Sequence, residues 1–170
     1  MKTLHVVGYK NSGKTTLLSR WVRLLKERGF TVAVLKHHGH GGKPVMSEEG
    51  TDTGTFLANG ADATLVAGGG SVQFIWNEEP DFRQLKTFVS LGQPDVLLIE
   101  GYKGEQGEKV LLLRNEEDWD SLRDIEGKQL VIGCSEIEPE CLHINSRENE
   151  REIDEWFAKW IAGGRADETV

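Results

Sequence analysis

The sequence contains few cysteines, no long apolar run and no excess of basic residues. Its two cysteines, Cys134 and Cys141, are separated by six residues, a spacing that matches no zinc motif. Apolar runs such as residues 96–99 are far shorter than a membrane-spanning helix. Lys and Arg total 20 against 28 Asp and Glu, and the formal net charge is -8. These features argue against a zinc domain, a membrane protein and an extended nucleic-acid-binding face.

The composition is typical of a globular protein with a buried hydrophobic core. It has 170 residues, of which 38% are hydrophobic, with a mean hydropathy of -0.42. We expect one domain over residues 1–163 and a small polar tail over 164–170. Because a strand is predicted from residue 3, the sequence leaves no space for a signal peptide, and we expect a cytoplasmic protein.

Residues 8–15 form the most informative motif, a phosphate-binding loop of the pattern G-x-x-x-x-G-K-[ST]. An apolar run over residues 4–7 precedes it, and a helical pattern of apolar residues follows over 17–25. At such a strand-to-helix turn, the unpaired N–H groups of the first helical turn face an anion. Lys14 can neutralise the β- and γ-phosphates of a nucleotide, and the Thr15 hydroxyl can bind Mg²⁺. Unless the segment is a glycine-rich turn that binds nothing, the predicted nucleotide contacts are Gly8, Tyr9, Lys10, Asn11, Ser12, Gly13, Lys14, Thr15 and Thr16.

A second, acidic element supports this loop, because the apolar run over residues 96–99 ends in Glu100. A buried strand that delivers one carboxylate to Mg²⁺ or to its water shell has this form. Glu100 stands where an aspartate is usual, so we expect it to reach the metal through water. Asp52, near the start of a predicted helix, is a further candidate for Mg²⁺ or the γ-phosphate, with helix capping as the alternative.

Residues 36–44 form a glycine-rich loop after a predicted strand, at the same edge of the sheet as the phosphate-binding loop. Three interpretations stay open for it: contact with phosphates or a second substrate, a metal site, or a solvated loop. The candidate residues for this second site are Lys36, His37, His38, His40 and, after a later predicted strand, Lys103.

The sequence lacks N-K-x-D, the motif with which many GTPases bind guanine. An acidic residue that follows the strand predicted over 109–113 or the strand predicted over 129–132 could still contact the base. The candidates are Asn115, Asp118, Ser135 and Glu136, each with a helix cap or a solvated turn as the alternative. No glutamine is convincingly placed to orient water, and no arginine is clearly placed as a finger. We therefore expect slow hydrolysis, or hydrolysis that needs a partner.

Hydrophobic periodicity predicts alternating strands and helices. Helices are expected over residues 14–28, 47–60, 80–91 and 147–161, and strands over 3–7, 31–35, 63–67, 71–76, 95–100, 109–113 and 129–132. Asn145 and Glu148 form a possible capping box for the last helix. Glycines at 68–70 indicate an antiparallel hairpin, so we do not expect a purely parallel sheet. The predicted fold is a three-layer α/β/α P-loop NTPase domain with a mainly parallel sheet and an antiparallel hairpin.

Residues 7–17 and three further segments resemble the MobB family, the bacterial molybdopterin-guanine dinucleotide biosynthesis adaptors. The further segments are 36–38, 52–61 and 98–103. The resemblance implies a homodimer that binds GTP and Mg²⁺ and hydrolyses GTP weakly. Its expected partners are the MobA guanylyltransferase, which joins GMP to molybdopterin, and other molybdenum cofactor enzymes. The adaptor would deliver GTP or help to hand on molybdopterin. Carried onto this chain, the resemblance gives Lys14 and Glu100 a role in weak hydrolysis and Thr15 a place beside Mg²⁺.

Two other functions stay open on the sequence. A small-molecule kinase would use the same loop with residues 37–49 as its lid, although no acceptor site is evident. A metallochaperone would bind its metal through His37, His38 and His40, with the nucleotide as a switch. For none of these functions do we expect nucleic acid or a membrane as partner.

Overall fold

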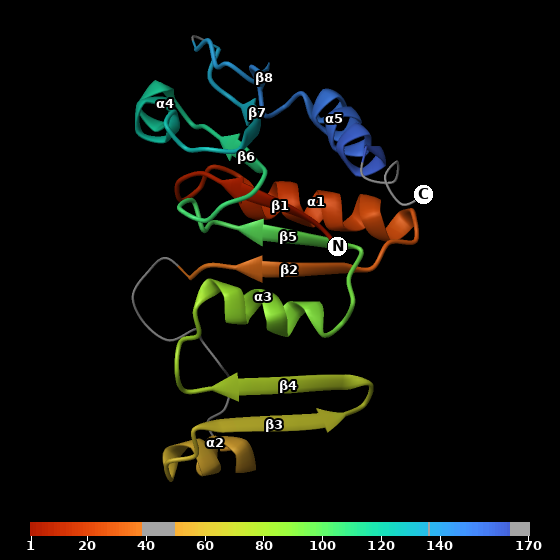
Figure 1. The fold of residues 1–170 in the computed structure, drawn as a ribbon, viewed down its shortest axis with the longest axis vertical. Helices are drawn as coiled ribbons and strands as arrows, with labels where there is room; N and C mark the ends of the chain where they lie inside the picture. The colour runs from red at the N-terminus through yellow and green to blue at the C-terminus, as the bar shows by residue number, and fades with distance from the viewer. Residues whose placement is uncertain (39–49, 136, 164–170) are drawn as a thin grey trace. The chain divides into compact units, whose positions relative to one another are not determined.

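The computed structural model describes residues 1–38, 50–135 and 137–163 (Figure 1). The chain divides into two compact units. One comprises Met1–His37 and Lys86–Val170, and the other comprises His38–Leu85. The single domain expected over 1–163 stays a prediction, and the polar tail expected over 164–170 lies outside the described residues.

The first unit is built on a six-stranded sheet in which every neighbouring pair of strands is parallel. The strand order is β2-β5-β1-β6-β7-β8. The strands are β1 (Lys2–Val7), β2 (Val32–Lys36), β5 (Val96–Glu100), β6 (Lys109–Leu112), β7 (Lys128–Ile132) and β8 (Leu142–Ile144). Because the strands are parallel, their carboxyl ends share one edge, where Glu100 pairs with Val6 on one side and with Lys36 on the other.

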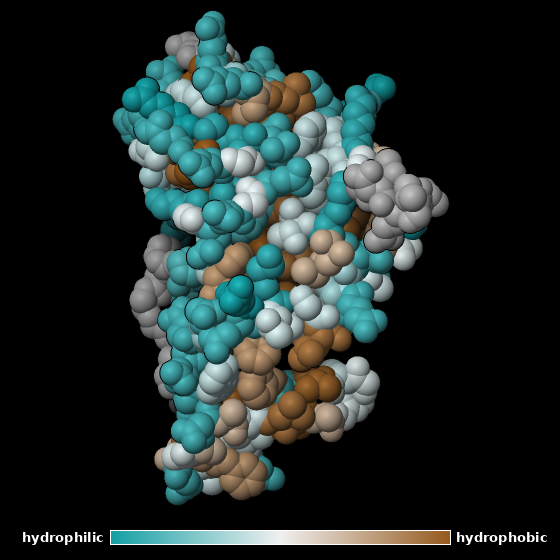
Figure 2. Space-filling view, in the orientation of Figure 1, coloured by the Kyte–Doolittle hydropathy of each residue, from teal (hydrophilic) through white to brown (hydrophobic). Residues whose placement is uncertain are grey.

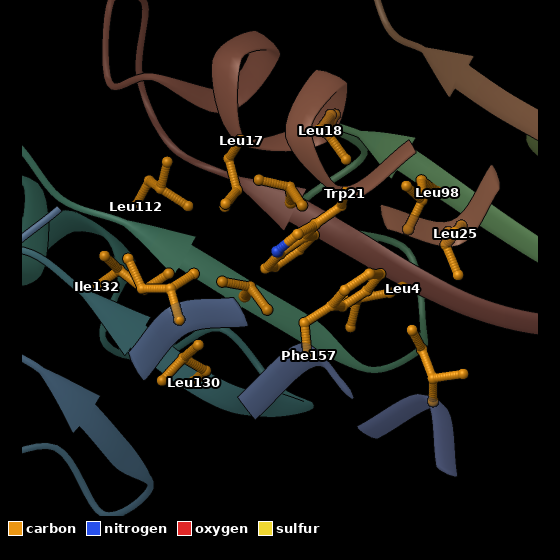
Figure 3. Packing of buried hydrophobic residues seen from close by; sticks show 14 of the residues in the cluster. Leu4, Leu17, Leu18, Trp21, Leu25, Leu98, Leu112, Leu130, Ile132 and Phe157 are labelled. Atoms are coloured by element: carbon orange, nitrogen blue, oxygen red, sulfur yellow. The ribbon is translucent and has the colours of Figure 1, made fainter. Parts of the chain in front are cut away.

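Helices cover both faces of this sheet. They are α1 (Lys14–Glu27), α4 (Glu116–Leu122) and α5 (Glu150–Ala162), while α3 (Phe82–Ser90) spans the boundary between the units. On one face, Trp21 of α1 and Phe157 of α5 stack with ring centroids 4.1 Å apart (Figure 3). On the other face, Leu122 of α4 joins the cluster that contains Leu111 and Val131. The predicted three-layer α/β fold is thus confirmed.

The second unit contains α2 (Asp52–Ala58) and a hairpin of β3 (Ala63–Gly68) and β4 (Ser71–Trp76). Gly69 and Gly70 at the turn have φ of 57° and 81°, the left-handed conformation that a two-residue hairpin turn needs. The predicted hairpin is therefore confirmed, but it forms a two-stranded sheet of its own. The expectation that the main sheet is not purely parallel is wrong, because the antiparallel pair does not join it.

Three helices begin later than the periodicity predicts, α3 by two residues at Phe82 and the other two by three or more. α2 begins at Asp52, because the Thr51 hydroxyl accepts a hydrogen bond from the Gly54 N–H at 3.1 Å, and residues 47–49 lie outside the described ranges. α5 begins at Glu150. The periodicity predicts neither α4 nor β8, since segments of 7 and 3 residues are too short to show a period. Within the described ranges, no helix has the length and apolarity needed to cross a bilayer.

Candidate nucleotide-binding site

The loop between β1 and α1 has a shape that depends on its glycines. A Cβ on Gly8 would lie 2.5 Å from the Leu112 carbonyl oxygen and 2.6 Å from the Ser12 hydroxyl oxygen, so no larger residue fits there. Gly13, the N-cap of α1, has a φ of 95°, and Asn11 has a φ of 63°. In the described structure no side chain caps α1, which leaves the first N–H groups of the helix for an anion.

The side chain of Lys14 folds back over this loop. Its Nζ donates a hydrogen bond of 2.7 Å to the Tyr9 carbonyl oxygen. Burial lowers the pKa of Lys14 below its usual value; Glu100 acts against this shift, and the cations Lys36 and Arg114 act with it. A phosphate group beside the ammonium would supply negative charge and favour the protonated lysine.

Thr15 and Glu100 meet at the helix end of the loop. The Thr15 hydroxyl donates to one Glu100 carboxylate oxygen at 3.1 Å, and the Lys36 Nζ lies 2.8 Å from the other oxygen. The Glu100 side chain is only 11% exposed, because β5 is buried along its whole length. A hydroxyl and a carboxylate side by side are oxygen ligands of the kind that Mg²⁺ prefers, so these two residues fit the ion.

Three residues of the predicted second site lie at the same edge of the sheet. Lys36 is paired with Glu100, and the ring of His37 packs against Tyr102 with the centroids 4.9 Å apart. The Nζ of Lys103 lies 6.0 Å from the ring centroid of Tyr9, a residue of the phosphate-binding loop. The structure thus places Lys36, His37 and Lys103 at the carboxyl edge of the sheet, with Lys103 beside Tyr9 of the loop, and the binding of a second ligand there stays a prediction.

The other residues of the predicted second site and metal site belong to the second unit or lie outside the described ranges. His38 is exposed at the start of the second unit, and His40 is not among the described residues. Where the structure describes the chain, no three His, Cys, Asp or Glu side chains are grouped as metal ligands. Asp52 is the first residue of α2 and lines an open cleft of about 1010 Å³ within the second unit. Their roles as ligands stay predictions.

Asn115 and Asp118 are two of the candidates for a base contact. In the structure Asn115 caps α4, and Asp118 holds the side chain of Arg114. The Asn115 side-chain oxygen accepts the Asp118 N–H at 3.0 Å and caps the helix. The carboxylate of Asp118, a buried residue, accepts three hydrogen bonds from Arg114, and these hold the pKa of Asp118 below its usual value. Ser135 is exposed, and Glu136 lies outside the described residues. A base contact by any of the four stays a prediction.

Two arginines that no motif singles out contact the loop from outside. The Arg114 Nη1 donates to the Lys10 carbonyl oxygen at 3.2 Å, and the Arg147 Nη1 donates to the Ser12 carbonyl oxygen at 3.2 Å. Arg114 directly follows the strand predicted over 109–113, so its place at this edge could have been inferred. Arg147 follows β8, which the pattern does not reveal, and no local signal marks it.

Comparison with known proteins links the chain to one family. Residues 3–133 match the model of MobB, described as molybdopterin guanine dinucleotide synthesis protein B. A protein of Bacillus subtilis (strain 168), named a probable molybdopterin-guanine dinucleotide biosynthesis adapter protein, is 40% identical over 122 residues. This alignment covers 72% of the present chain and 70% of the relative.

Solved structures of MobB proteins have the same fold. The crystal structure of Bacillus subtilis MobB superposes with a TM-score of 0.80 and 34% identity, over 93% of this chain and 97% of that one. The structure of a MobB homolog from Bacillus stearothermophilus gives a TM-score of 0.78 and 31% identity, over 96% of this chain and 99% of that one. The similarity therefore extends far beyond the phosphate-binding loop.

Proposed function

The chain belongs to the MobB family, and on this premise we propose that it is an adapter in molybdopterin-guanine dinucleotide biosynthesis that binds GTP with Mg²⁺. One observation carries the nucleotide part of the proposal. The hydroxyl of Thr15, the last residue of the phosphate-binding motif, is hydrogen-bonded to the buried carboxylate of Glu100. The loop and the acidic strand thus form one site for a metal-bound phosphate. The guanine dinucleotide in the relatives' names favours GTP over ATP.

Each residue of this site has its own task in binding a triphosphate. The N–H groups at the start of α1 face the phosphate oxygens, and the Lys14 ammonium compensates their charge. Thr15 and Glu100 would hold Mg²⁺, which when bound neutralises charge on the β- and γ-phosphates. Lys36, 2.8 Å from Glu100, keeps a further positive charge at the same place. The proposal includes slow hydrolysis only, in line with the lack of a convincingly placed water-orienting glutamine in the sequence.

A competition titration tests the choice of nucleotide. We expect GTP to displace a fluorescent guanine nucleotide at lower concentration than ATP does, and Mg²⁺ to tighten the binding of GTP. Glu100→Gln keeps the size of the side chain but removes its charge, so the apparent affinity for Mg²⁺ should fall about 10-fold or more. Glu155→Gln, on the exposed side of α5, is the control. A preference for ATP of about tenfold would rule out the proposed GTP adapter.

The proposed adapter acts as a homodimer beside the MobA guanylyltransferase, and it delivers GTP or helps to hand on molybdopterin. The hairpin of the second unit supports association. Leu65 and Val72 lie on the same face of this hairpin and are 64% and 66% exposed. Figure 2 shows apolar side chains at the surface of the part of the chain that carries β3 and β4. Exposed apolar residues that adjoin one another favour contact with another protein surface.

Analytical ultracentrifugation tests this association. We expect the wild-type chain to sediment as a dimer and Leu65→Asp to shift it toward the monomer, because a charge at the interface would have to be desolvated. Ser71→Asp adds the same charge at an exposed polar position of the hairpin and should leave the dimer intact. Adding the guanylyltransferase with GTP should give a heavier complex. A monomer at every concentration would contradict the dimer, and the lack of a complex would contradict the adapter role.

A further inference from the structure

Arg114 and Arg147 reach the phosphate-binding loop from two different segments, and both donate to main-chain carbonyl groups of the loop. We propose that these arginines, together with Asp118, are positioning residues that hold the N–H groups of the loop in the orientation that binds phosphate. The inference rests on the proposed binding of GTP and adds residues that the motif itself does not contain. It also gives Asp118 a task other than contact with the base.

The two contacts fix two peptide planes of the loop. The Arg114 Nη1 lies 3.2 Å from the Lys10 carbonyl oxygen, and the Arg147 Nη1 lies 3.2 Å from the Ser12 carbonyl oxygen. In a trans peptide the carbonyl group and the following N–H group point to opposite sides, and the described chain has no cis peptide. The N–H groups of the two following residues therefore point away from the guanidinium groups, toward the side where an anion can accept them.

The two planes lie in a tight turn of the loop. Asn11 and Gly13 have φ of 63° and 95°, a left-handed conformation that glycine adopts freely and asparagine adopts more readily than most other residues. The Ser12 side chain between them is fully buried, and its hydroxyl has no hydrogen-bond partner among the described residues. The Ser12 hydroxyl therefore does not hold the second plane, whereas the contact from Arg147 does.

Arg114 is itself held in place from its other side. Its Nε and Nη2 donate to the two carboxylate oxygens of Asp118 at 2.8 and 2.7 Å, the paired geometry that makes an arginine contact both strong and directional. Asp118 is 2% exposed and lies in the first turn of α4, which Asn115 caps. The guanidinium carbon lies 5.4 Å from the centroid of the Tyr9 ring. α4 thus acts on the loop through Asp118 and Arg114.

A base contact by Asp118 would compete with this arrangement. The carboxylate would have to release the hydrogen bonds from Arg114 before it could accept from guanine, and the guanidinium would lose its buried partner. The two tasks differ in the ligands that they affect. A base contact changes the affinity for GTP alone, whereas a positioning role changes the affinity for every ligand that carries the phosphates.

Three probes separate these tasks: GTP, ATP and inorganic tripolyphosphate, which has no base. We expect Asp118→Asn and Arg147→Ala each to weaken the binding of all three by a similar factor of about 10, the loss typical of one charged hydrogen bond. Arg147→Lys keeps an N–H donor at this position and should recover part of the lost affinity. Arg151→Ala removes an exposed arginine of α5 that is paired with Glu155, so it should bind all three ligands as the wild type does.

The possible outcomes distinguish the inference from the proposed function. If the wild type binds GTP and Asp118→Asn loses affinity for GTP alone, Asp118 contacts the base and the inference is overturned. Unchanged affinities in Asp118→Asn and Arg147→Ala overturn it as well. Thermal unfolding without ligand shows whether each variant is folded. If Asp118→Asn or Arg147→Ala does not fold, Arg147→Lys becomes the test: weaker binding of all three ligands than in the wild type supports the positioning role, and unchanged binding overturns it. A wild type that binds none of the three ligands would defeat the proposed function and this inference together.

Discussion

Replacing Lys14 with alanine is expected to weaken GTP binding about 100-fold or more, while the nucleotide-free protein keeps its free energy of unfolding. The side chain donates to a carbonyl of its own loop, that of Tyr9, at 2.7 Å. Burial lowers the pKa of Lys14, so without a ligand the desolvated charge stabilises the fold little. With a triphosphate bound, the same ammonium gains charged hydrogen bonds to phosphate oxygens, and the variant loses them.

Two measurements together test this expectation. Isothermal titration with GTP and Mg²⁺ gives the loss of affinity, and chemical denaturation without nucleotide gives the free energy of unfolding. Lys159→Ala removes an exposed lysine of α5 and is the matched control, with affinity and stability expected to be unchanged. An unchanged affinity for GTP in Lys14→Ala would contradict the proposed binding of phosphate by Lys14. A loss of stability comparable to that of a core truncation would show that Lys14 supports the fold instead.

Truncating Phe157 to alanine is expected to cost about 3 to 5 kcal/mol of unfolding free energy, a large part of the stability of a domain of this size. The side chain is fully buried and stacks on Trp21 with ring centroids 4.1 Å apart. A second aromatic neighbour is Trp160, at 5.7 Å between centroids, and Phe157 belongs to the larger apolar cluster around it. Loss of the ring leaves a cavity between α1, α5 and the sheet that these rigid neighbours cannot fill.

Urea denaturation followed by circular dichroism measures this cost. Leu91→Ala removes a large apolar side chain that is 78% exposed, and it should change the free energy of unfolding by no more than about 0.5 kcal/mol. If Phe157→Ala costs as little as Leu91→Ala, α5 does not pack on the sheet as described. If the folded forms of both variants bind GTP with equal affinity, Phe157 contributes to the free energy of unfolding and not to GTP binding.

The parts of the fold that the sequence predicts are those with a local signal. The loop from Gly8 to Thr15 has a spacing that fixes both its position and its neighbours in the chain. The strand that ends in Glu100 is one unbroken apolar run, and the hairpin turn needs the left-handed backbone of Gly69 and Gly70. In each case the residues that determine the structure are adjacent in sequence, so the pattern alone identifies the element.

The start of α5 shows where a local signal is ambiguous. Asn145 and Glu148 have the spacing of a capping box, and Asn149 and Glu152 repeat the same spacing four residues later. The N-cap of α5 is Asn149; its side chain donates to Glu152 but makes no capping hydrogen bond to the helix backbone, so neither spacing forms a capping box. The spacing alone therefore does not locate the start of the helix. Packing explains the start at Glu150, because the helix presents Ile153 and later apolar residues to the sheet.

The sequence predicts those residues of the candidate site that belong to a motif. The meeting of Thr15 with Glu100 follows from a parallel sheet that brings two strand ends together. The contacts of Arg114 and Arg147 with the loop do not, because they join segments 104 and 135 residues apart. Asn115 and Asp118 carry the residue types of a base contact, yet their hydrogen bonds form a helix cap and an ion pair. Side-chain partners of this kind become visible only with the tertiary structure.

The place of the second unit in the chain determines how changes in its length would affect the sheet. The chain leaves the sheet at the end of β2 and returns to it at the beginning of β5, and these two strands are hydrogen-bonded neighbours. The pairing of Lys36 with Glu100 is therefore set by the sheet, whatever the length of the segment between the two strands. Insertions and deletions in that segment can therefore be accommodated without moving Lys36 away from Glu100. The second unit can thus change in size or surface while the arrangement of Lys36 and Glu100 at the sheet edge is kept.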